Sequence, residues 1–222
     1  MTILLLMGMI LVSKRLSELA VSGEVEEQKD VIVIDPGHGG TDPGKVGVNG
    51  VLEKEINLQI AGKVKQELEK KGYQVIMTRE TDDSSESKRE DMKKRVELIN
   101  DVMPVLTVSI HQNSYTDPSV NGAQVFYYTN STEGQNLAAL IQKSLITIVD
   151  PTNHRTEKSN NSYYLLKNVK APIVIVECGF LSNWEESKKL VDDTYQQKLA
   201  WAIHLGILQY LNGVNANLHI LK

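Results

Sequence analysis

The stretch VIVIDPGHGG, residues 31–40, decides the fold that the sequence predicts. Its four leading β-branched residues predict a buried strand, because a short apolar run bounded by turn residues is typical of one. Pro36 and the glycines at 37, 39 and 40 predict a turn where the strand ends. A turn does not need His38, so this histidine is either incidental surface polarity or part of a site that a ligand approaches.

Beyond this stretch, strands and helices alternate. Apolar runs predict strands at 31–35, 74–79, 104–111, 122–129, 163–167 and 172–178, and apolar stripes predict helices at 53–71, 88–102, 134–149 and 194–212. Apolar strands that alternate with helices indicate a sheet covered on both faces. The expected fold class is α/β: a single domain with a mixed, mostly parallel sheet of about six strands flanked by helices on both faces.

Composition limits the classes of function. The chain has 222 residues, enough for one sizeable α/β domain or two small ones. Its net charge of −4 argues against a nucleic-acid partner, since binding phosphates draws on Lys and Arg. The single cysteine excludes an intramolecular disulfide and any cysteine-rich zinc module.

The N-terminal residues point to export. ILLLMGMILV at 3–12 is too short to span a bilayer comfortably but fits the apolar core of a signal peptide. Lys14 and Arg15 follow this run, whereas a signal peptide carries its positive charge ahead of it. An ordinary amphipathic helix is therefore the alternative, but we expect a signal peptide or membrane anchor at 1–22 and a linker at 23–30.

Three predicted strands end in residues that can carry chemistry. His38 follows the first strand, His111 ends the third and Glu177 ends the sixth. Sites in open α/β sheets form beyond the carboxyl ends of strands. A carboxylate such as Glu177 at the end of an apolar strand is costly unless hydrogen bonds, a cation or a metal compensate it. Two imidazoles with a carboxylate and a water make a catalytic zinc set.

The helix after the first turn offers two acids as the third ligand. Glu55 lies in line with a solvated row of polar residues, whereas Glu53 lies at the flank of the buried stripe, which favours Glu53. The alternative is that Glu53 is merely an acid in the first turn of a helix, where the helix dipole favours one.

At this point the chain resembles a known family, the zinc-dependent N-acetylmuramoyl-L-alanine amidases, the peptidoglycan amidases of the AmiC and CwlD type. The segments that carry the resemblance are, in chain order, IDPGHGGTDPG (34–44), EKEINLQIA (53–61), SIHQNS (109–114) and VECGFLSN (176–183). Any one of these motifs is weak, but four in order are a strong signal. The single domain without wall-binding repeats is most similar to the germination-specific amidases of spore-forming bacteria.

The resemblance implies a role for each residue of the site. His38, Glu53 and His111 would bind Zn²⁺, and Glu177 would be the catalytic carboxylate. The reaction would be hydrolysis of the amide between the lactyl group of N-acetylmuramic acid and L-alanine of the stem peptide. The catalytic amidase domain would span residues 31–213, and a C-terminal tail would follow at 214–222. We also expect Asn113, Arg155 and Asn160 to contact the substrate, although a solvated loop is the alternative for 153–168.

The resemblance further implies where and with what the protein works. The substrate would be peptidoglycan of the spore cortex, in the maturation that yields muramic lactam and is needed for germination. The protein would act outside the cytoplasm, secreted or tethered at the cell wall, or in the forespore intermembrane space. A lone catalytic domain also suggests a protein partner that activates or localises it. The apolar residues at the N-terminus suggest association with a membrane.

Two other functions remain open on the residues alone. A zinc peptidase or carboxypeptidase acting on cell-wall peptides would use the same metal set. A wall-binding module with a structural zinc would need no turnover, but structural zinc sites usually have four protein ligands and the sequence offers three. A divalent ion other than zinc would also suit two imidazoles and a carboxylate.

Overall fold

The computed structural model describes residues 30–82 and 87–220, with the backbone alone for 215–220. It contains the strands β1 (Val31–Pro36), β2 (Gln74–Met77), β3 (Leu106–Asn113), β4 (Gln124–Tyr128), β5 (Lys158–Asn160) and β6 (Ile173–Phe180), and the helices α2 (Glu53–Glu69), α3 (Lys88–Val102), α4 (Thr132–Ile148), α5 (Tyr164–Asn168), α6 (Trp184–Leu190) and α7 (Asp193–Ile220). The predicted signal peptide or anchor at 1–22 lies outside the described residues, as does nearly all of the linker. No helix in the described ranges combines the length and the apolar character needed to cross a bilayer.

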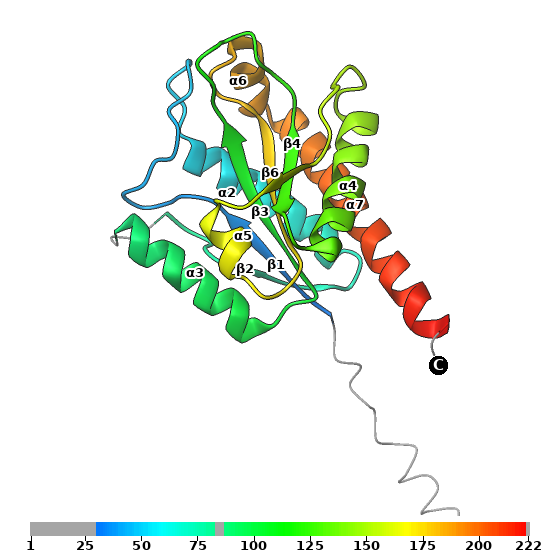
Figure 1. Cartoon of the computed structure of the whole chain (residues 1–222). Helices are drawn as coiled ribbons and strands as arrows, with labels where there is room; N and C mark the ends of the chain where they lie inside the picture. Colours follow the sequence, from blue (N-terminus) through cyan, green and yellow to red (C-terminus); the bar gives the residue numbers. More distant parts are fainter. Residues whose placement is uncertain (1–29, 83–86, 221–222) are drawn as a thin grey trace, which may run out of the picture.

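The six strands form one sheet in the order β2-β1-β3-β6-β4-β5. Neighbouring strands run parallel except for β4, which is antiparallel to β6. The sheet and its flanking helices are visible in Figure 1, and the predicted α/β fold class is confirmed. Because β1, β3 and β6 are parallel neighbours, their carboxyl ends meet at one edge of the sheet, where a site is expected.

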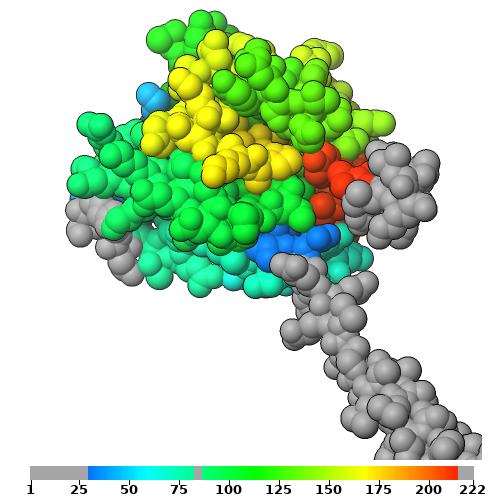
Figure 2. All heavy atoms as spheres, turned by 60° about the horizontal axis from the view of Figure 1, so that its bottom comes forward, coloured from blue at the N-terminus to red at the C-terminus, as the bar shows by residue number. Residues whose placement is uncertain are grey.

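Helices cover both faces of the sheet. On one face, residues of α2, α4 and α7 share a core cluster with the sheet, and α7 packs against both α2 and α4. On the other face, Ile99 of α3 and Leu166 of α5 pack in a second cluster with Val33 and Ile175. Figure 2 shows α3 and α5 side by side on this second face, where Asn100 Nδ2 donates to Asn168 O at 3.0 Å.

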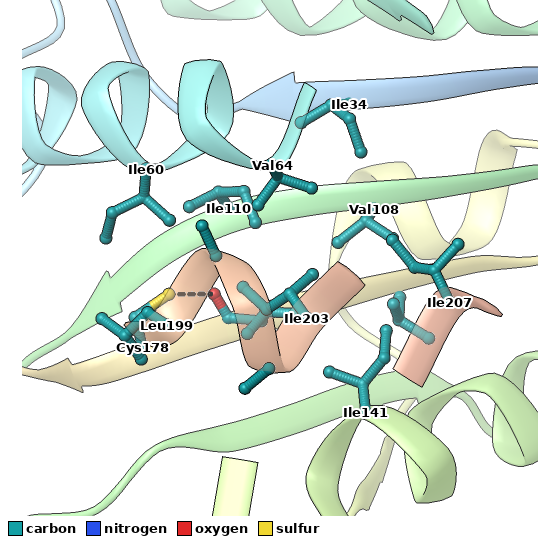
Figure 3. Close-up of a cluster of buried hydrophobic side chains, with 14 of the residues drawn as sticks. Ile34, Ile60, Val64, Val108, Ile110, Ile141, Cys178, Leu199, Ile203 and Ile207 are labelled. Atoms are coloured by element: carbon teal, nitrogen blue, oxygen red, sulfur yellow. Dashed lines mark hydrogen bonds between the residues drawn. The ribbon is translucent and has the colours of Figure 1, made fainter. Parts of the chain in front are cut away.

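Two apolar stripes build the larger core. The stripes predicted for the first and last long helices are buried within the helices: Ile56, Ile60, Val64 and Leu68 of α2, and Leu199, Ile203, Ile207 and Leu211 of α7. Leu52, predicted to begin the first stripe, is half-buried and precedes α2. In Figure 3, Ile60 and Ile203 lie against the sheet near Ile110, and Cys178 lies among the same apolar side chains. Cys178 is fully buried, as expected for a packing residue.

One predicted strand is wrong. Residues predicted as a strand at 163–167 form helix α5, and the edge strand β5 lies just before it at Lys158–Asn160. The side chain of Asn160 accepts hydrogen bonds from the backbone N–H groups of Ser162 and Tyr163. Asparagine in this role turns the chain at the end of a strand, so the apolar run that follows starts a helical turn rather than extending the sheet.

The C-terminal part differs from the prediction in two further respects. Helix α6 was not predicted, although Asn183 caps it by accepting from the N–H groups of Glu185 and Glu186. Helix α7 continues to Ile220, into the stretch assigned to a tail at 214–222. A strongly polar seven-residue helix has little apolar periodicity, so the pattern of apolar residues does not predict α6.

A buried ion pair lies under the edge of the sheet where β1 ends. Asp35 Oδ1 accepts from Arg95 Nη1 at 2.8 Å, and Asp35 Oδ2 accepts from Ser109 Oγ at 2.6 Å. Burial by itself raises the pKa of Asp35, but Arg95 and the hydroxyl donors outweigh it, so the pKa lies below its ordinary value. The carboxylate is therefore ionised at neutral pH and compensates the buried guanidinium.

Asp35→Asn is expected to lower the free energy of unfolding at pH 7 by up to about 3–5 kcal/mol, because it removes the fully buried partner of Arg95 and leaves only the partly exposed Asp91 to compensate the charge. The destabilisation by Asp35→Asn should become smaller as the pH falls below 3.8, the ordinary pKa of an aspartate. Because the pKa of Asp35 is lowered in the folded state, its contribution to stability is complete above 3.8 and is lost as the pH falls through the folded-state pKa. Urea unfolding at several pH values measures both effects. Asp91→Asn is the matched control: Asp91 pairs with Arg95 Nε but is 24% exposed, so its loss should be clearly smaller. Equal losses at the two positions would contradict the assignment.

Candidate metal centre

Three elements bring the predicted ligands to one place. His38 lies in the turn after β1, Glu53 is the first residue of α2 and His111 lies near the end of β3. One donor atom from each of the three lies within 4.8 Å of the others. The sequence-predicted ligands therefore converge, although 15 and then 58 positions separate them along the chain.

The carboxylate of Glu53 is the centre of this group. Glu53 Oε1 lies 3.2 Å from His38 Nε2 and 2.9 Å from His111 Nδ1. Its side chain is 2% exposed, and burial by itself raises its pKa, but hydrogen bonds with His111 and His38 outweigh burial and hold the pKa well below the usual range. Glu53 is therefore an ionised, buried carboxylate rather than a solvated acid of a helix's first turn, whereas Glu55 is exposed.

Neighbouring groups fix the orientation of the Glu53 and His38 side chains. Gln112 N donates to Glu53 Oε1 at 3.1 Å, and Lys45 N donates to Oε2 at 2.8 Å. Asp42 Oδ2 lies 2.8 Å from His38 Nδ1. Burial by itself raises the pKa of Asp42, but hydrogen bonds with His38 and Lys88 outweigh it and lower the pKa to about 2. An ionised carboxylate only accepts, so Asp42 holds a proton on His38 Nδ1, and the other ring nitrogen, Nε2, faces Glu53 Oε1 in the site.

The surroundings of the three converging side chains fit a metal ion. Two neutral imidazole nitrogens and a carboxylate oxygen are the donor set of a catalytic zinc site. Gly37 and Gly44 let the backbone approach closely: a Cβ at Gly37 would overlap the His111 ring, and one at Gly44 would lie 2.6 Å from Glu53 Oε2. Asp42 behind His38 is the outer partner that a metal-binding histidine usually has.

Glu177 faces the same cavity from β6. It is the direct neighbour of His111 across the β3–β6 pairing. With the three ligands it lines a cavity of about 520 Å³. Glu177 is 8% exposed, and its Oε2 atom has no hydrogen-bond partner among the described residues. Burial raises the pKa of Glu177 to about 7, although the neighbouring His111 opposes the rise.

The predicted substrate contacts divide. Asn113 lines the cavity together with Tyr163, which comes from the start of α5. Arg155 and Asn160 are not among the described residues that line it. Arg155 donates to Asn121 O at 2.7 Å and lies over the Phe180 ring, and Asn160 turns the chain into α5. Arg155, between β4 and β5, is thus used for packing, and Asn160, the last residue of β5, for turn formation.

Asn57 belongs to the site but is absent from the sequence-based set of site residues. It is buried on α2, and its Nδ2 donates to Gly37 O at 3.0 Å. Its Oδ1 accepts from Gln112 Nε2 at 3.1 Å. Asn57 thus joins the His38 turn, the helix of Glu53 and the strand of His111. The available signal is a polar residue four positions after Glu53, in line with it on the buried side of the helix.

Comparisons with known proteins point to one family. A family model described as N-acetylmuramoyl-L-alanine amidase matches residues 32–209. The chain is 40% identical to the germination-specific N-acetylmuramoyl-L-alanine amidase of Bacillus subtilis (strain 168), over 81% of this chain and 79% of that protein. It is 36% identical to the N-acetylmuramoyl-L-alanine amidase LytC of the same strain, over 82% of this chain and 35% of that protein.

Two solved structures of amidases have a similar fold. The CwlD amidase from Clostridioides difficile, determined in complex with the GerS lipoprotein, superposes with a TM-score of 0.80 at 40% identity, over 83% of this chain and 99% of that chain. An N-acetylmuramoyl-L-alanine amidase from Clostridium difficile 630 superposes with a TM-score of 0.77 at 33% identity, over 84% and 98%. Given a family model that spans most of the described residues, the chain belongs to the N-acetylmuramoyl-L-alanine amidase family and is an enzyme of that class.

Proposed function

We propose that the enzyme hydrolyses the amide between the lactyl group of N-acetylmuramic acid and L-alanine of the stem peptide, with Zn²⁺ held by His38, Glu53 and His111. Glu177 is the catalytic carboxylate. One observation carries the proposal: the three converging donors line a single cavity with a fourth carboxylate, whose Oε2 atom has no hydrogen-bond partner among the described residues. Three protein ligands leave a coordination position for water or substrate, which is the pattern of catalytic rather than structural zinc.

The side chains divide the chemistry of amide hydrolysis. When held by His38, Glu53 and His111, zinc would act as a Lewis acid toward the amide carbonyl and would lower the pKa of water to about 7. Glu177 takes a proton from the attacking water and returns it to the amine of L-alanine as the C–N bond breaks. Burial raises the pKa of Glu177 above that of an ordinary glutamate, and this direction suits both steps, because a general base and acid works best near the operating pH. Asp42 keeps His38 in the tautomer that presents Nε2.

We further infer that the substrate is spore-cortex peptidoglycan and that the reaction serves muramic-lactam formation before germination. The support is the 40% identity to the germination-specific amidase of Bacillus subtilis over 81% of this chain. Action then takes place outside the cytoplasm, at the cell wall or in the forespore intermembrane space, with residues 1–22 as signal peptide or anchor. A localising or activating protein partner is part of this proposal, since the similar Clostridioides difficile amidase was solved with a lipoprotein.

Mass spectrometry of muropeptides after incubation with the zinc-loaded protein tests the proposed reaction. The expected products are glycan freed of its peptides and stem peptides that begin with L-alanine. Cleavage within the stem peptide would instead identify a cell-wall peptidase. Intact muropeptides from both cortex and vegetative peptidoglycan would contradict any hydrolase function, and preference for the vegetative substrate would contradict the cortex assignment alone.

A further inference from the structure

Two arginine side chains hold the turn that carries His38. Arg79 donates through Nε to Pro36 O at 3.0 Å and through Nη2 to Gly37 O at 3.1 Å. Arg95 donates through Nη1 to Pro36 O at 2.7 Å and through Nη2 to His38 O at 2.5 Å. The carbonyl oxygens of three successive residues therefore all accept from guanidinium groups.

This turn needs such support because its backbone is strained. His38 has a φ of 60°, in the left-handed region that residues other than glycine rarely adopt. Strain of this kind persists only where the surrounding structure over-determines the conformation. Four hydrogen bonds from two charged donors within three residues supply that constraint, and hydrogen bonds from charged groups are stronger than neutral ones.

Arg79 connects the turn to the helix of the second ligand. Its Nη2 also donates to Lys54 O at 2.7 Å, in the first turn of α2 beside Glu53. The packing is close, since a Cβ at Gly39 would lie 2.9 Å from Arg79 Cδ. One guanidinium therefore fixes the distance between the His38 turn and the start of α2.

Arg95 connects the turn to the strand of the third ligand. It is 5% exposed and pairs with Asp35, which accepts from Ser109 Oγ at 2.6 Å. Ser109 lies on β3, two residues before His111 and on the same face of the strand. The position of His38 relative to His111 is thus fixed through a continuous path of hydrogen bonds.

Neither arginine is among the described residues that line the cavity. Their hydrogen bonds described above go to backbone carbonyls of the His38 turn and of α2 and to Asp35, and so they act through the residues they hold. The requirement is for arginine rather than for positive charge, because each side chain reaches two or more acceptors with a planar fork that an ammonium group does not reproduce.

We propose that Arg79 and Arg95 are positioning residues that jointly hold the His38 turn in register with Glu53 and His111, and that this pre-organisation sets the affinity of the protein for its metal. The inference rests on the proposed function, in that these three side chains bind zinc.

Arg79→Lys and Arg95→Lys test the proposal. Each keeps the charge and loses the fork, and each is expected to weaken zinc binding by about 10- to 100-fold, the usual cost of losing an outer partner of a metal ligand. Competition with a chromophoric chelator measures the affinity without reference to activity. The absorption spectrum of the Co²⁺-substituted protein should also change, because the ligand geometry around the ion shifts. Circular dichroism and thermal melting establish that each variant folds, and Arg79→Lys, at the less buried position, decides the matter if Arg95→Lys does not fold.

Arg155→Lys is the matched control. Arg155 also donates to a backbone carbonyl, that of Asn121, but makes no hydrogen bond to the His38 turn. It should lower the melting temperature at most and leave the zinc affinity unchanged. Unchanged affinity in folded Arg79→Lys, or an equal loss in Arg155→Lys, would overturn this inference alone. Failure of the unsubstituted protein to bind zinc would overturn the proposed function together with it.

Discussion

Replacing Glu177 with glutamine is expected to lower kcat by about 10²- to 10⁴-fold, the usual contribution of a general acid and base. Glutamine has nearly the same shape but cannot take a proton from water at neutral pH. Because Glu177 is not one of the three converging donors, the variant should keep one zinc ion per chain. Muropeptide turnover and metal content, measured on the same preparation, check both parts of this result.

Cys178→Ala is the matched control for this substitution. Cys178 follows Glu177 on β6, but its side chain is fully buried in the core on the opposite face. Burial raises the pKa of the Cys178 thiol, which leaves it a poor nucleophile. The alanine variant should therefore keep its turnover at some cost in stability. Full hydrolysis by Glu177→Gln would show that the proton shuttle is another group, and lost turnover in folded Cys178→Ala would point to cysteine chemistry.

Replacing Glu53 with glutamine is expected to have the second large effect, on metal binding itself. The loss in zinc affinity should exceed the roughly 10- to 100-fold typical of outer partners, because a ligand is removed. The oxygens of Glu53 accept from two different backbone N–H groups, those of Gln112 and Lys45. An amide would turn its NH₂ group toward one of these donors, so the side chain also loses its fixed orientation.

Glu55→Gln is the matched control on the same helix. Glu55 is exposed and lies two positions away on the solvated side of α2. It should leave zinc content and turnover unchanged. Metal analysis after dialysis measures the first and muropeptide release the second. Zinc retained at full affinity by Glu53→Gln, or lost by Glu55→Gln, would show that the third ligand is assigned wrongly.

Much of the fold could be predicted because it depends on patterns that single residues do not disturb. The buried stripes of α2 and α7 repeat every fourth residue, and apolar runs form the strand that precedes His38 and the strands that carry His111 and Glu177. Parallel neighbouring strands then bring their carboxyl ends together. The convergence of the three ligands followed from these regularities and from the four motifs.

The parts that escaped prediction depend on specific hydrogen bonds. The mostly apolar run at 163–167 does not indicate that the side chain of Asn160 turns the chain just before α5 begins. Arg155 in a polar loop resembles a substrate contact, yet its guanidinium binds Asn121 O and packs on Phe180. Arg79 and Arg95 carry no periodic signal at all. Their importance arises only when distant backbone carbonyls meet in space.

X-ray absorption at the zinc edge, on the purified full-length protein, tests the central claim most directly. We expect nitrogen and oxygen neighbours at about 2.0–2.1 Å, with the outer scattering of two imidazole rings. The same measurement on Glu53→Gln should show the first shell depleted or the metal absent. A sulfur neighbour at about 2.3 Å, or a protein that retains no zinc while still releasing stem peptides, would contradict the account.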